Sequence, residues 1–506
     1  MGRISKLLVA NRGEIAVRIM RTCREMQIKT VAVYSDADRR MPHVQLADEA
    51  YHIGPAPSRE SYLAIGRIIE AAVRSRADAV HPGYGFLAEN DAFAQRVGDE
   101  GLIFVGPSPY SIRAMGDKTE ARRLVGLSGV PIVPGTEGTV NSEGEARDYC
   151  RQVGFPVLVK AAAGGGGKGM RIIKNDAELT SSFRAAQSEA LSAFGDGRVF
   201  LEKYLETPRH IEFQILADQF GNTVHLGERE CTIQRRHQKI LEESPSVMVD
   251  DVLREEMGEC AVRAAKAARY VNAGTIEFLV DGNRDFFFLE MNTRLQVEHP
   301  ITEMRTGIDI VSAQLHIAMG ERLPYRQEEI QFRGHAIECR IYAEDPMDDF
   351  LPSTGTISHL GRTEGFGIRE DRGVEAGDTI PVYYDPLISK LCAWGTTREE
   401  ALSRMSGALQ NYEILGVRTN IPLNLFVLKH PKFVQGSFDT HFLSNHYRPE
   451  LLPRPSEPEK KAAACLLAVL RDRPVQSAAA AVCTQLSNYS DCSWKSRRIE
   501  NLRFPE

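Results

Sequence analysis

A run of glycines between two lysines is the most distinctive segment of the sequence. It reads Lys160-Ala-Ala-Ala-Gly-Gly-Gly-Gly-Lys168-Gly169-Met170. Consecutive glycines let backbone N–H groups close around phosphate oxygens, because no Cβ atom stands in the way, and the lysines add positive charge. The run is not a Walker A loop, because Lys168 is followed by glycine rather than Ser or Thr. It predicts a phosphate-binding flap between two strands, with a flexible hairpin as the alternative.

Acidic and polar side chains recur at every second position between residues 290 and 298. If a strand extends through this segment, one face of it carries five polar side chains, because side chains alternate with period two. The hard oxygens of Glu277, Glu290 and Asn292 suit Mg²⁺ that bridges nucleotide phosphates. The alternative is a solvated strand face, but the preceding segment 286–289 (Phe-Phe-Phe-Leu) is too apolar for an exposed edge. The five side chains are Glu290, Asn292, Arg294, Gln296 and Glu298.

Two further segments place charged side chains at alternating positions. One segment has basic side chains at every second position, namely Arg235, His237 and Lys239. In the other, Glu338 and Arg340 are two positions apart and alternate with apolar residues. Basic groups on the interior face of a strand suit anionic ligands. Taken alone, each segment is better explained as a surface charge cluster than as a site.

The segment Gly83-Tyr-Gly-Phe-Leu-Ala88 fits the GxGxxA pattern of dinucleotide-binding turns. Such a site needs an acidic residue at the end of the next strand. That strand ends Val105-Gly106-Pro107, without an acid. We therefore predict a tight turn close to a ligand and not an NAD site.

The elements that must position these residues begin with alternating strands and helices over residues 1–115. Short apolar runs separated by helical spacing are typical of a doubly wound α/β fold, a parallel sheet with helices on both faces. Ligands gather at the carboxyl edge of such a sheet, where Asn11-Arg-Gly-Glu14 is expected. The predicted strands are Leu7–Ala10, Val31–Tyr34, Ala77–Val80 and Ile103–Val105, with helices around Ile15–Cys23 and Tyr62–Val73.

From residue 116 the pattern becomes α+β with mostly antiparallel strands. A third region, 331–446, mixes strands with a helix near Glu399–Tyr412, and a proline-rich linker opens the tail 447–506. Helices are predicted at Lys118–Leu127 and Val252–Tyr270, and strands at Val157–Lys160, Arg171–Lys174, Val199–Tyr204, Ile211–Ala217, Val224–Leu226, Thr275–Val280, Phe286–Met291 and Gly334–Tyr342.

Composition narrows the class of protein. The 506 residues carry 62 Lys+Arg and 68 Asp+Glu, a net charge of −6, so we expect neither nucleic-acid nor anionic-membrane binding. Nine cysteines without a CxxC pair argue against a disulfide framework or zinc site and indicate a reducing cytoplasm. We expect no signal peptide and no membrane span, because the longest apolar run, Ala462–Leu470, is far below roughly 18 residues.

Together these segments resemble biotin carboxylase, an ATP-grasp ligase, over about residues 3–445. Two further segments, starting at Ser188 and His210, resemble the biotin carboxylase subunits of acetyl-/propionyl-CoA carboxylases. The main resemblance is carried by Val9-Ala-Asn-Arg-Gly-Glu-Ile-Ala, His81-Pro-Gly-Tyr-Gly-Phe-Leu, Met115-Gly-Asp-Lys118, the glycine run, Glu202-Lys203-Tyr-Leu205, Gln234-Arg-Arg-His-Gln-Lys239, Glu290-Met-Asn-Thr-Arg-Leu-Gln-Val-Glu-His-Pro and Arg340.

The resemblance implies a reaction and an architecture. Bicarbonate attacks the γ-phosphate of ATP, with Mg²⁺ or Mn²⁺, and the resulting carboxyphosphate breaks to CO₂ and phosphate; N1 of carrier-bound biotin loses a proton and takes up the CO₂. The implied domains are an N-terminal domain over 1–115, an ATP-grasp body over 116–330 with a mobile glycine-rich lid at about 134–204, a C-terminal domain over 331–446, and a tail over 447–506 of unknown role.

The resemblance also assigns roles to individual residues. Glu298 would deprotonate bicarbonate, Arg340 would stabilise the biotin enolate beside Tyr84, and Lys239 and Arg294 would join these two as catalytic residues. Bicarbonate would contact Arg294, Gln296, Val297 and Glu298, and the metal Glu277, Glu290 and Asn292. ATP would contact Lys118, Lys160, Gly165, Gly166, Gly167, Met170, Glu202, Lys203, Leu205, His210, Gln234, His237, Lys239, Glu277, Leu279 and Glu290.

The implied partners are a biotin carboxyl carrier protein and a carboxyltransferase subunit, because no Ala-Met-Lys-Met biotinylation motif occurs in the sequence. A cytoplasmic homodimer serving an acyl-CoA carboxylase, as in fatty acid biosynthesis, is the leading hypothesis. The alternatives are the equivalent subunit of a two-subunit pyruvate carboxylase, a non-catalytic nucleotide-binding homologue, and another ATP-grasp ligase.

Overall fold

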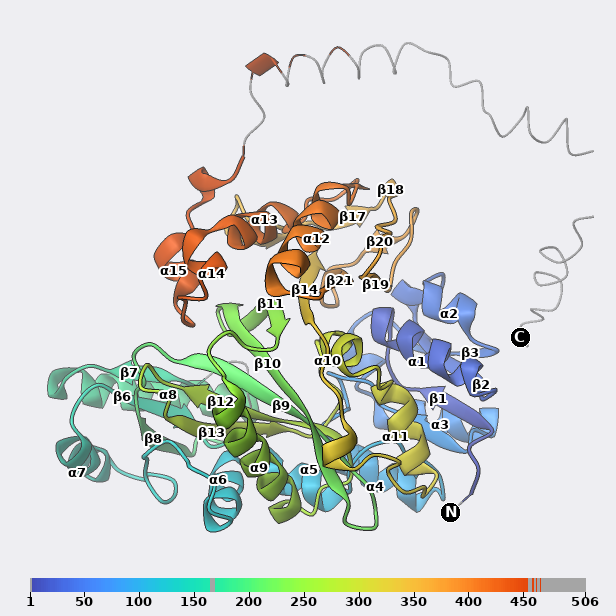
Figure 1. Cartoon of the computed structure of the whole chain (residues 1–506). Helices are drawn as coiled ribbons and strands as arrows, with labels where there is room; N and C mark the ends of the chain where they lie inside the picture. Colours follow the sequence, from blue (N-terminus) through green and yellow to red (C-terminus); the bar gives the residue numbers. More distant parts are fainter. Residues whose placement is uncertain (1, 164–168, 454–456, 459–460, 462–464, 466–506) are drawn as a thin grey trace, which may run out of the picture. The chain divides into compact units, whose positions relative to one another are not determined.

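The structure is a computed structural model that describes residues 2–163, 169–453, 457–458, 461 and 465 (Figure 1). The chain falls into two units, Met1–Leu452 and Pro453–Glu506, and most of the second lies outside the described residues. The predicted phosphate ligands Gly165, Gly166 and Gly167 also lie outside them. The labelled helices and strands of Figure 1 all belong to the first unit.

The N-terminal region contains a five-stranded parallel sheet in the order β3-β2-β1-β4-β5, as predicted for a doubly wound domain. Alternate residues of β1 face opposite sides, so Leu7 packs with α1 and Leu8 packs with α3. The strands are β1 (Lys6–Val9), β2 (Lys29–Ser35), β3 (Glu49–Gly54), β4 (Ala79–His81) and β5 (Ile103–Phe104); the helices are α1 (Gly13–Glu25), α2 (Pro42–Leu46), α3 (Ile65–Ser75), α4 (Asp91–Asp99) and α5 (Pro109–Gly116).

The lid region has a three-stranded antiparallel sheet in the order β7-β6-β8 and a hydrophobic core of its own. The glycine run joins β6 (Val157–Ala161) to β7 (Arg171–Ile173), so it lies between two strands as predicted. Strand β8 (Val199–Lys203) completes the sheet. Helices α7 (Glu143–Val153) and α8 (Asp176–Phe194), which the sequence analysis did not propose, pack on it. The mobility of the lid stays a prediction.

An eight-stranded, wholly antiparallel sheet carries most of the chemistry-bearing side chains. Its order is β13-β12-β9-β10-β11-β14-β21-β19. The sheet continues across the predicted boundary at residue 330, because its last three strands come from the C-terminal region. Its strands are β9 (Arg209–Ala217), β10 (Thr223–Arg235), β11 (Gln238–Ser244), β12 (Asn272–Val280), β13 (Phe286–Asn292), β14 (His335–Tyr342), β19 (Ile368–Arg372) and β21 (Leu387–Gly395).

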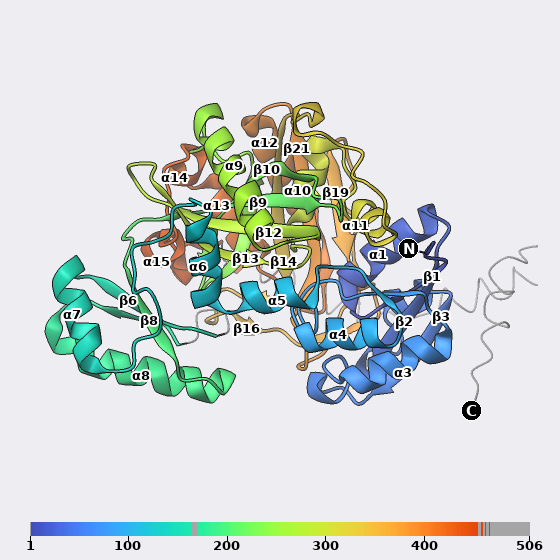
Figure 2. The same cartoon turned by 90° about the horizontal axis from the view of Figure 1, so that it is seen from below.

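The two faces of this sheet differ in chemistry. Apolar side chains of β9 such as Phe213 pack against α9 (Asp251–Ala267), which covers this face of the sheet (Figure 2). The intervening residues Glu212 and Gln214 point to the other face, where Arg229 also contacts Thr302 of α10 (His299–Thr306). Helix α6 (Lys118–Leu127) begins where Asp117 accepts the N–H groups of Thr119 and Glu120. Helix α11 (Ile310–Ala318) packs against the N-terminal region.

The remaining C-terminal elements enclose a separate core. Helices α12 (Arg398–Gln410) and α13 (Ile421–Lys429) pack on β14 and β21. Among the described residues, no helix combines the length and apolar character that a membrane crossing requires. The smaller elements are α14 (Pro431–Val434), α15 (Phe442–His446) and the strand pairs β15 (Glu344–Asp345) with β16 (Leu351–Pro352), β17 (Gly355–Thr356) with β20 (Thr379–Ile380), and β18 (His359–Leu360) with β22 (Ile414–Leu415).

Candidate active site

A cavity of about 1580 Å³ lies over the polar face of the large sheet and is bounded by the N-terminal, lid and C-terminal regions. Of the predicted site residues that the structure describes, all but Glu298 line it, and Glu298 lies directly behind the wall. The lining residues are Tyr84, Lys118, Lys160, Met170, Glu202, Lys203, Leu205, His210, Gln234, His237, Lys239, Glu277, Leu279, Glu290, Asn292, Arg294, Gln296, Val297 and Arg340.

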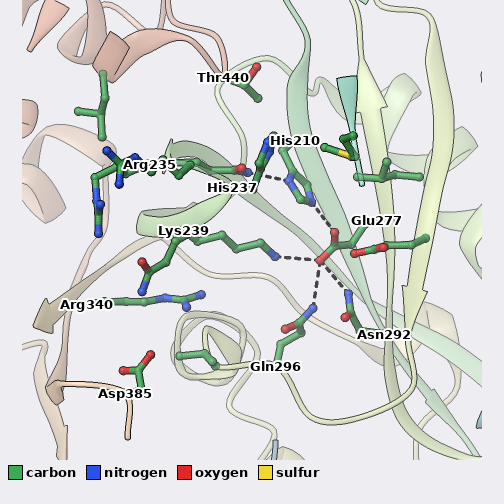
Figure 3. A pocket seen from close by; sticks show the side chains of 18 of the residues that line it. His210, Arg235, His237, Lys239, Glu277, Asn292, Gln296, Arg340, Asp385 and Thr440 are labelled. Carbon is green, nitrogen blue, oxygen red and sulfur yellow. Dashed lines mark hydrogen bonds and ion pairs between the residues drawn. The ribbon is translucent and has the colours of Figure 1, made fainter. Parts of the chain in front are cut away.

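Lys239 lies at the centre of the polar wall (Figure 3). Its Nζ is 2.6 Å from Glu212, 2.9 Å from Glu277 and 2.7 Å from Glu298. Burial lowers the pKa of Lys239, but the surrounding acidic groups more than offset it and hold that pKa well above its usual value. The lysine is therefore a fixed positive charge shared by three carboxylates.

Glu298 is fully buried, and cations hold both of its oxygens. One oxygen is 2.7 Å from Lys239, and the other is 3.0 Å from Nη2 of Arg340. Burial would raise the pKa of Glu298, but Lys239, Arg340 and Arg229 outweigh it and hold that pKa well below its usual range. The cations that favour the ionised carboxylate also weaken it as a proton acceptor.

A loop, and not an extended strand, brings the polar side chains of residues 290–298 together. Strand β13 ends at Asn292, within one residue of the predicted strand Phe286–Met291, so the strand does not extend through the segment and the single polar face does not form. The loop instead folds Arg294 back, and its guanidinium donates to Asn292 Oδ1 at 3.0 Å and to Gln296 Oε1 at 2.8 Å. Gln296 in turn donates to Glu277 Oε1 at 3.1 Å. The amide of Gln296 and the guanidinium of Arg294 therefore lie beside each other at the cavity wall.

The acidic residues predicted to hold a metal come from two neighbouring strands. Glu277 of β12 lies opposite Glu290 of β13 in the register, and Asn292 donates to Glu277 at 2.8 Å. Glu290 contacts Lys118 Nζ at 3.2 Å. Two carboxylates and an amide oxygen form a hard donor set, which fits Mg²⁺ or Mn²⁺ together with nucleotide phosphates.

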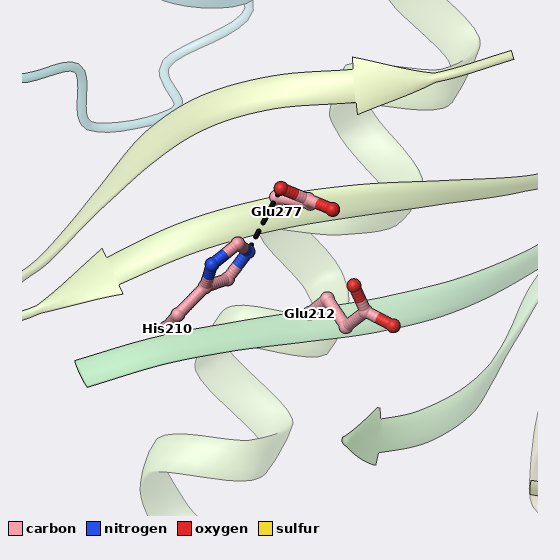
Figure 4. A group of neighbouring side chains, drawn as sticks. All are labelled: His210, Glu212 and Glu277. Atoms are coloured by element: carbon pink, nitrogen blue, oxygen red, sulfur yellow. Dashed lines mark ion pairs between the residues drawn. The ribbon is translucent and has the colours of Figure 1, made fainter. Parts of the chain in front are cut away.

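His210 extends this acidic cluster. His210 and Glu212 project from β9, and Glu277 projects from the adjacent strand (Figure 4). Candidate ligand atoms of these three residues lie within 4.8 Å of one another. Nε2 of His210 is 2.8 Å from Glu277, and Nδ1 is 2.7 Å from the amide of Gln234. Burial lowers the pKa of His210, but the Glu277 carboxylate outweighs it and raises that pKa above its usual value.

A tight hairpin carries the basic segment 235–239. Strand β10 ends at Arg235, β11 begins at Gln238, and the two residues between them have positive φ angles. Arg235, His237 and Lys239 therefore do not share the face of one strand, which corrects the prediction from parity. All three nevertheless line the cavity, because the hairpin folds over it.

The lid end of the cavity is built around Glu202. Its carboxylate pairs with Lys160 on one oxygen and with Arg122 on the other, and Arg122 also donates to the carbonyl of Val133 at 2.7 Å. Apolar side chains such as Leu279 complete this end, which suits a planar heterocycle with a polar edge. Arg122 was not predicted.

The opposite end of the cavity holds Tyr84 and Arg340. The turn after β4 is fixed by Asn11, whose amide donates to the carbonyls of Pro82 at 2.8 Å and Tyr84 at 2.7 Å. The hydroxyl of Tyr84 donates to Glu14. This confirms a tight turn beside the cavity, as predicted for the GxGxxA segment.

Three more groups in contact with site residues, besides Arg122, were not predicted. Glu212 is two positions after His210 in β9, so strand alternation places both side chains on the same face and could have predicted Glu212. Glu242 holds Arg340 at 2.6 Å. Lys390 is fully buried and donates to the carbonyl of Val297 at 2.9 Å, with Glu14 at 3.2 Å. The sequence contains no local signal for Lys390, because its partners are remote in the chain.

Comparison with protein families gives three matches along the chain. The model described as "Biotin carboxylase, N-terminal domain" matches residues 3–112. "Carbamoyl-phosphate synthase L chain, ATP binding domain" matches residues 117–326. "Biotin carboxylase C-terminal domain" matches residues 338–445.

Curated relatives include enzymes of several kinds. A biotin carboxylase of Halalkalibacterium halodurans is 52% identical over 443 residues, 88% of this chain and 98% of that protein. A pyruvate carboxylase subunit of Methanothermobacter thermautotrophicus is 52% identical over 445 residues, covering 88% and 90%. The mitochondrial alpha subunit of methylcrotonoyl-CoA carboxylase from Mus musculus is 48% identical over 480 residues, covering 94% of this chain and 67% of that protein.

Solved structures agree with the fold. The biotin carboxylase domain dimer of Hydrogenobacter thermophilus 2-oxoglutarate carboxylase, in complex with MgADP, ADP and bicarbonate, has a TM-score of 0.85 at 49% identity, covering 88% of this chain and 98% of that chain. Biotin carboxylase from Campylobacter jejuni has a TM-score of 0.86 at 45% identity, covering 88% and 99%.

Proposed function

The chain belongs to the biotin carboxylase family of ATP-dependent ligases, and we propose that its cavity carboxylates biotin from bicarbonate through carboxyphosphate. One observation carries the proposal: Lys239, Glu277, Glu298 and Arg340 converge on one cavity wall although they come from different segments of the chain. A nucleotide-phosphate cluster therefore adjoins a carboxylate base and a permanent cation.

ATP would bind between the lid and the large sheet. Its base and ribose would lie against Glu202, Lys203, Leu205, Met170 and Leu279, and its phosphates would meet Lys118, Lys160, His210, Gln234, His237, Lys239 and the glycine run, including Gly165, Gly166 and Gly167. Glu277, Glu290 and Asn292 would hold Mg²⁺ or Mn²⁺. The metal, when bound, neutralises phosphate charge as the phosphoryl group is transferred.

Bicarbonate would bind where Arg294, Gln296 and the backbone of Val297 meet Glu298. Bicarbonate is a weak nucleophile, and it attacks the γ-phosphorus better once Glu298 removes its proton. Lys239 would move its hydrogen bond from Glu298 to the anion and the phosphate. That movement raises the basicity of Glu298 when it is needed, because Lys239 is a main cause of its low pKa.

Biotin would bind beside Tyr84 and Arg340. Carboxyphosphate breaks its C–O bond to release CO₂ and phosphate; the phosphate takes the N1 proton of biotin, and N1 then forms a bond to the carbon of CO₂. Arg340 would stabilise the enolate oxygen, because a guanidinium keeps its charge at every physiological pH. Exclusion of water by the lid would protect carboxyphosphate from hydrolysis.

The test is ATP hydrolysis by the purified chain. We expect hydrolysis that depends on bicarbonate and is stimulated by free biotin. Nucleotide binding without any bicarbonate-dependent hydrolysis would favour the alternative, a non-catalytic nucleotide-binding homologue.

We propose an acyl-CoA carboxylase as the wider complex, with a biotin carboxyl carrier protein and a carboxyltransferase as partners. The alpha chains of methylcrotonoyl-CoA carboxylase and propionyl-CoA carboxylase among the relatives support this, at 48% and 51% identity. The second candidate is the equivalent component of a pyruvate carboxylase, because that relative is 52% identical. Reconstitution with co-purified partners, followed by assay with acyl-CoA substrates and with pyruvate, distinguishes the two.

We also propose a homodimer in the cytoplasm. A related domain crystallised as a dimer. The described cysteines are all free thiols, which suits a reducing compartment. Sedimentation of the purified chain at micromolar concentration measures the oligomeric state, and a monomer there would contradict the dimer.

A further inference from the structure

Two buried glutamates lie directly opposite each other behind Arg340. Glu242 of β11 and Glu338 of β14 are register partners in the antiparallel ladder, and neither is exposed to solvent. Side chains at such positions are neighbours, with Cβ atoms roughly 5 Å apart. Glu242 binds Arg340 through Oε1, at 2.7 Å from Nε and 2.6 Å from Nη2. Arg340 therefore lies between this pair of glutamates and the cavity.

Each of these carboxyl groups keeps one buried oxygen without a hydrogen-bond partner. The oxygens are Oε2 of Glu242 and Oε1 of Glu338. Two ionised carboxylates offer only acceptors, so they cannot satisfy each other. A single proton shared by the two carboxyl groups would supply the missing donor.

The charges around Glu338 favour the same arrangement. Within the described part of the chain, no cationic nitrogen lies within 4 Å of Glu338, and its one hydrogen-bond partner is the thiol of Cys392, with Sγ 3.3 Å from Oε2. A buried carboxylate without a paired cation is costly to keep ionised. Lys390 and Arg340 lower the pKa of Glu338 from a distance, but burial and the charge of Glu242 outweigh them and raise it well above its usual value.

Glu242 differs from Glu338 in its partner. Burial raises the pKa of Glu242, assisted by Glu298, while Arg340 and Lys239 act in the opposite sense. Because Arg340 binds Glu242, the negative charge of the pair is better placed on Glu242 and the proton on Glu338.

We propose that Glu242 and Glu338 share one proton at neutral pH, with Glu338 donating to Glu242, and that this proton preserves the positive charge of Arg340 for its ligand. Glu298 already offsets part of that charge. A fully ionised pair would place further negative charge behind the guanidinium and weaken its hold on an enolate oxygen. The second half of the proposal rests on the proposed function; the first half does not.

Infrared spectroscopy tests the proton directly. The C=O stretch of a protonated carboxylic acid is separate from carboxylate bands and shifts in D₂O. We expect such a band in the wild-type protein at pH 7, its loss in Glu338→Gln, and its retention in Glu243→Gln. Glu243 is the matched control because it is equally buried on the same strand but is paired with His335 and Arg398. The absence of any such band in the wild-type protein overturns the proposal even if a variant fails to fold.

The pH dependence of biotin-stimulated turnover tests the role of the proton. Loss of the proton leaves two negative charges behind Arg340 and should reduce turnover on the alkaline side. Neither Glu242→Gln nor Glu338→Gln can place two charges there, so in both variants the alkaline limb should disappear or move up by at least about one pH unit. Glu243→Gln should leave the limb in place. An alkaline limb that stays in place in both pair variants overturns the role while the infrared result stands. A wild-type protein without biotin-stimulated turnover refutes the proposed function instead.

Discussion

The carboxylate of Glu298, the proposed base, is fully occupied by cations in this structure. Both oxygens are engaged, one by Lys239 and one by Arg340. The same contacts that keep Glu298 charged also weaken it as a base. In the proposed reaction, substrates that attract these cations would therefore prepare Glu298 for proton transfer.

At the residue scale, Glu298→Gln should separate binding from chemistry. The amide fills the same space but cannot accept the bicarbonate proton, so we expect biotin carboxylation to fall by about 10²- to 10⁴-fold. The nucleotide dissociation constant should change little. The two quantities are measured by fixation of labelled bicarbonate and by calorimetric titration of ADP. Glu120→Gln on the exposed surface of α6 is the control, and equal loss of binding and turnover would refute the role of Glu298 as base.

The sequence identified most polar groups of the cavity wall because their spacing and types were unusual. It did not identify Lys390 or Arg122. The sequence around a lysine in an apolar strand is the same whether the lysine is exposed or is buried with several partners. Only the fold brings Lys390 to Glu14 and to the carbonyl of Val297.

At the scale of elements, the amide of Asn11 makes two of the hydrogen bonds that hold the turn after β4. Asn11→Ala removes two hydrogen bonds to the carbonyls of Pro82 and Tyr84. Each is worth roughly 1 kcal/mol. Because Tyr84 lies at the proposed biotin end of the cavity, we expect KM for biotin to rise by about 10-fold, while bicarbonate-dependent ATP hydrolysis without biotin is preserved. Steady-state kinetics measure both.

Asn90→Ala is a matched control for that turn, because Asn90 also makes a local backbone bond, as the cap of α4. It should lower stability by about 1 kcal/mol and leave KM for biotin unchanged. A uniform loss of all activities in Asn11→Ala would mean that the turn supports the fold and not the biotin end of the cavity.

The same turn makes stability depend on pH through His81. Its Nδ1 accepts the N–H of Gly83 at 3.0 Å, and burial lowers its pKa to about 4. Below pH 6.5 the unfolded chain binds a proton that the folded chain excludes. The unfolding free energy should therefore fall between pH 6.5 and pH 4, by about 3 kcal/mol from this residue. Urea unfolding of the wild type and of His81→Asn at pH 7 and pH 5 measures the difference, and His359→Asn, at an exposed site, should leave the slope unchanged.

The segment 290–298 shows where alternation of polar residues does not imply a strand. Polar residues alternate through the segment, yet Pro300 lies in the first turn of α10 and favours a helix start there. The strand must end before that helix begins.

Antiparallel pairing was predicted for this part of the chain, and helices α6, α9 and α12 were predicted close to their observed bounds. Their apolar spacing is regular and their ends carry capping residues.

At the scale of the whole molecule, Lys390 joins three regions of the chain. It contacts Glu14 of α1, Asp371 of β19 and the loop before α10. Lys390→Met leaves the Glu14 carboxylate buried without its cation, and we expect a loss of about 3–5 kcal/mol. Urea unfolding measures it. Arg123→Met, which breaks an exposed pair with Glu120, should cost less than about 1 kcal/mol. Equal effects of the two substitutions would contradict a central role for Lys390.

The large sheet also determines how the chain can be divided. Strands β11 and β14 are hydrogen-bonded neighbours, although a family boundary lies between them in the sequence. Division of the gene near residue 330 would therefore yield two fragments, one with Glu298 and the other with Arg340. Each fragment would expose a strand edge with unpaired backbone N–H and C=O groups, which promotes aggregation. Neither fragment should be active alone. Turnover recovered after the two fragments are mixed would show that β11 and β14 had paired again.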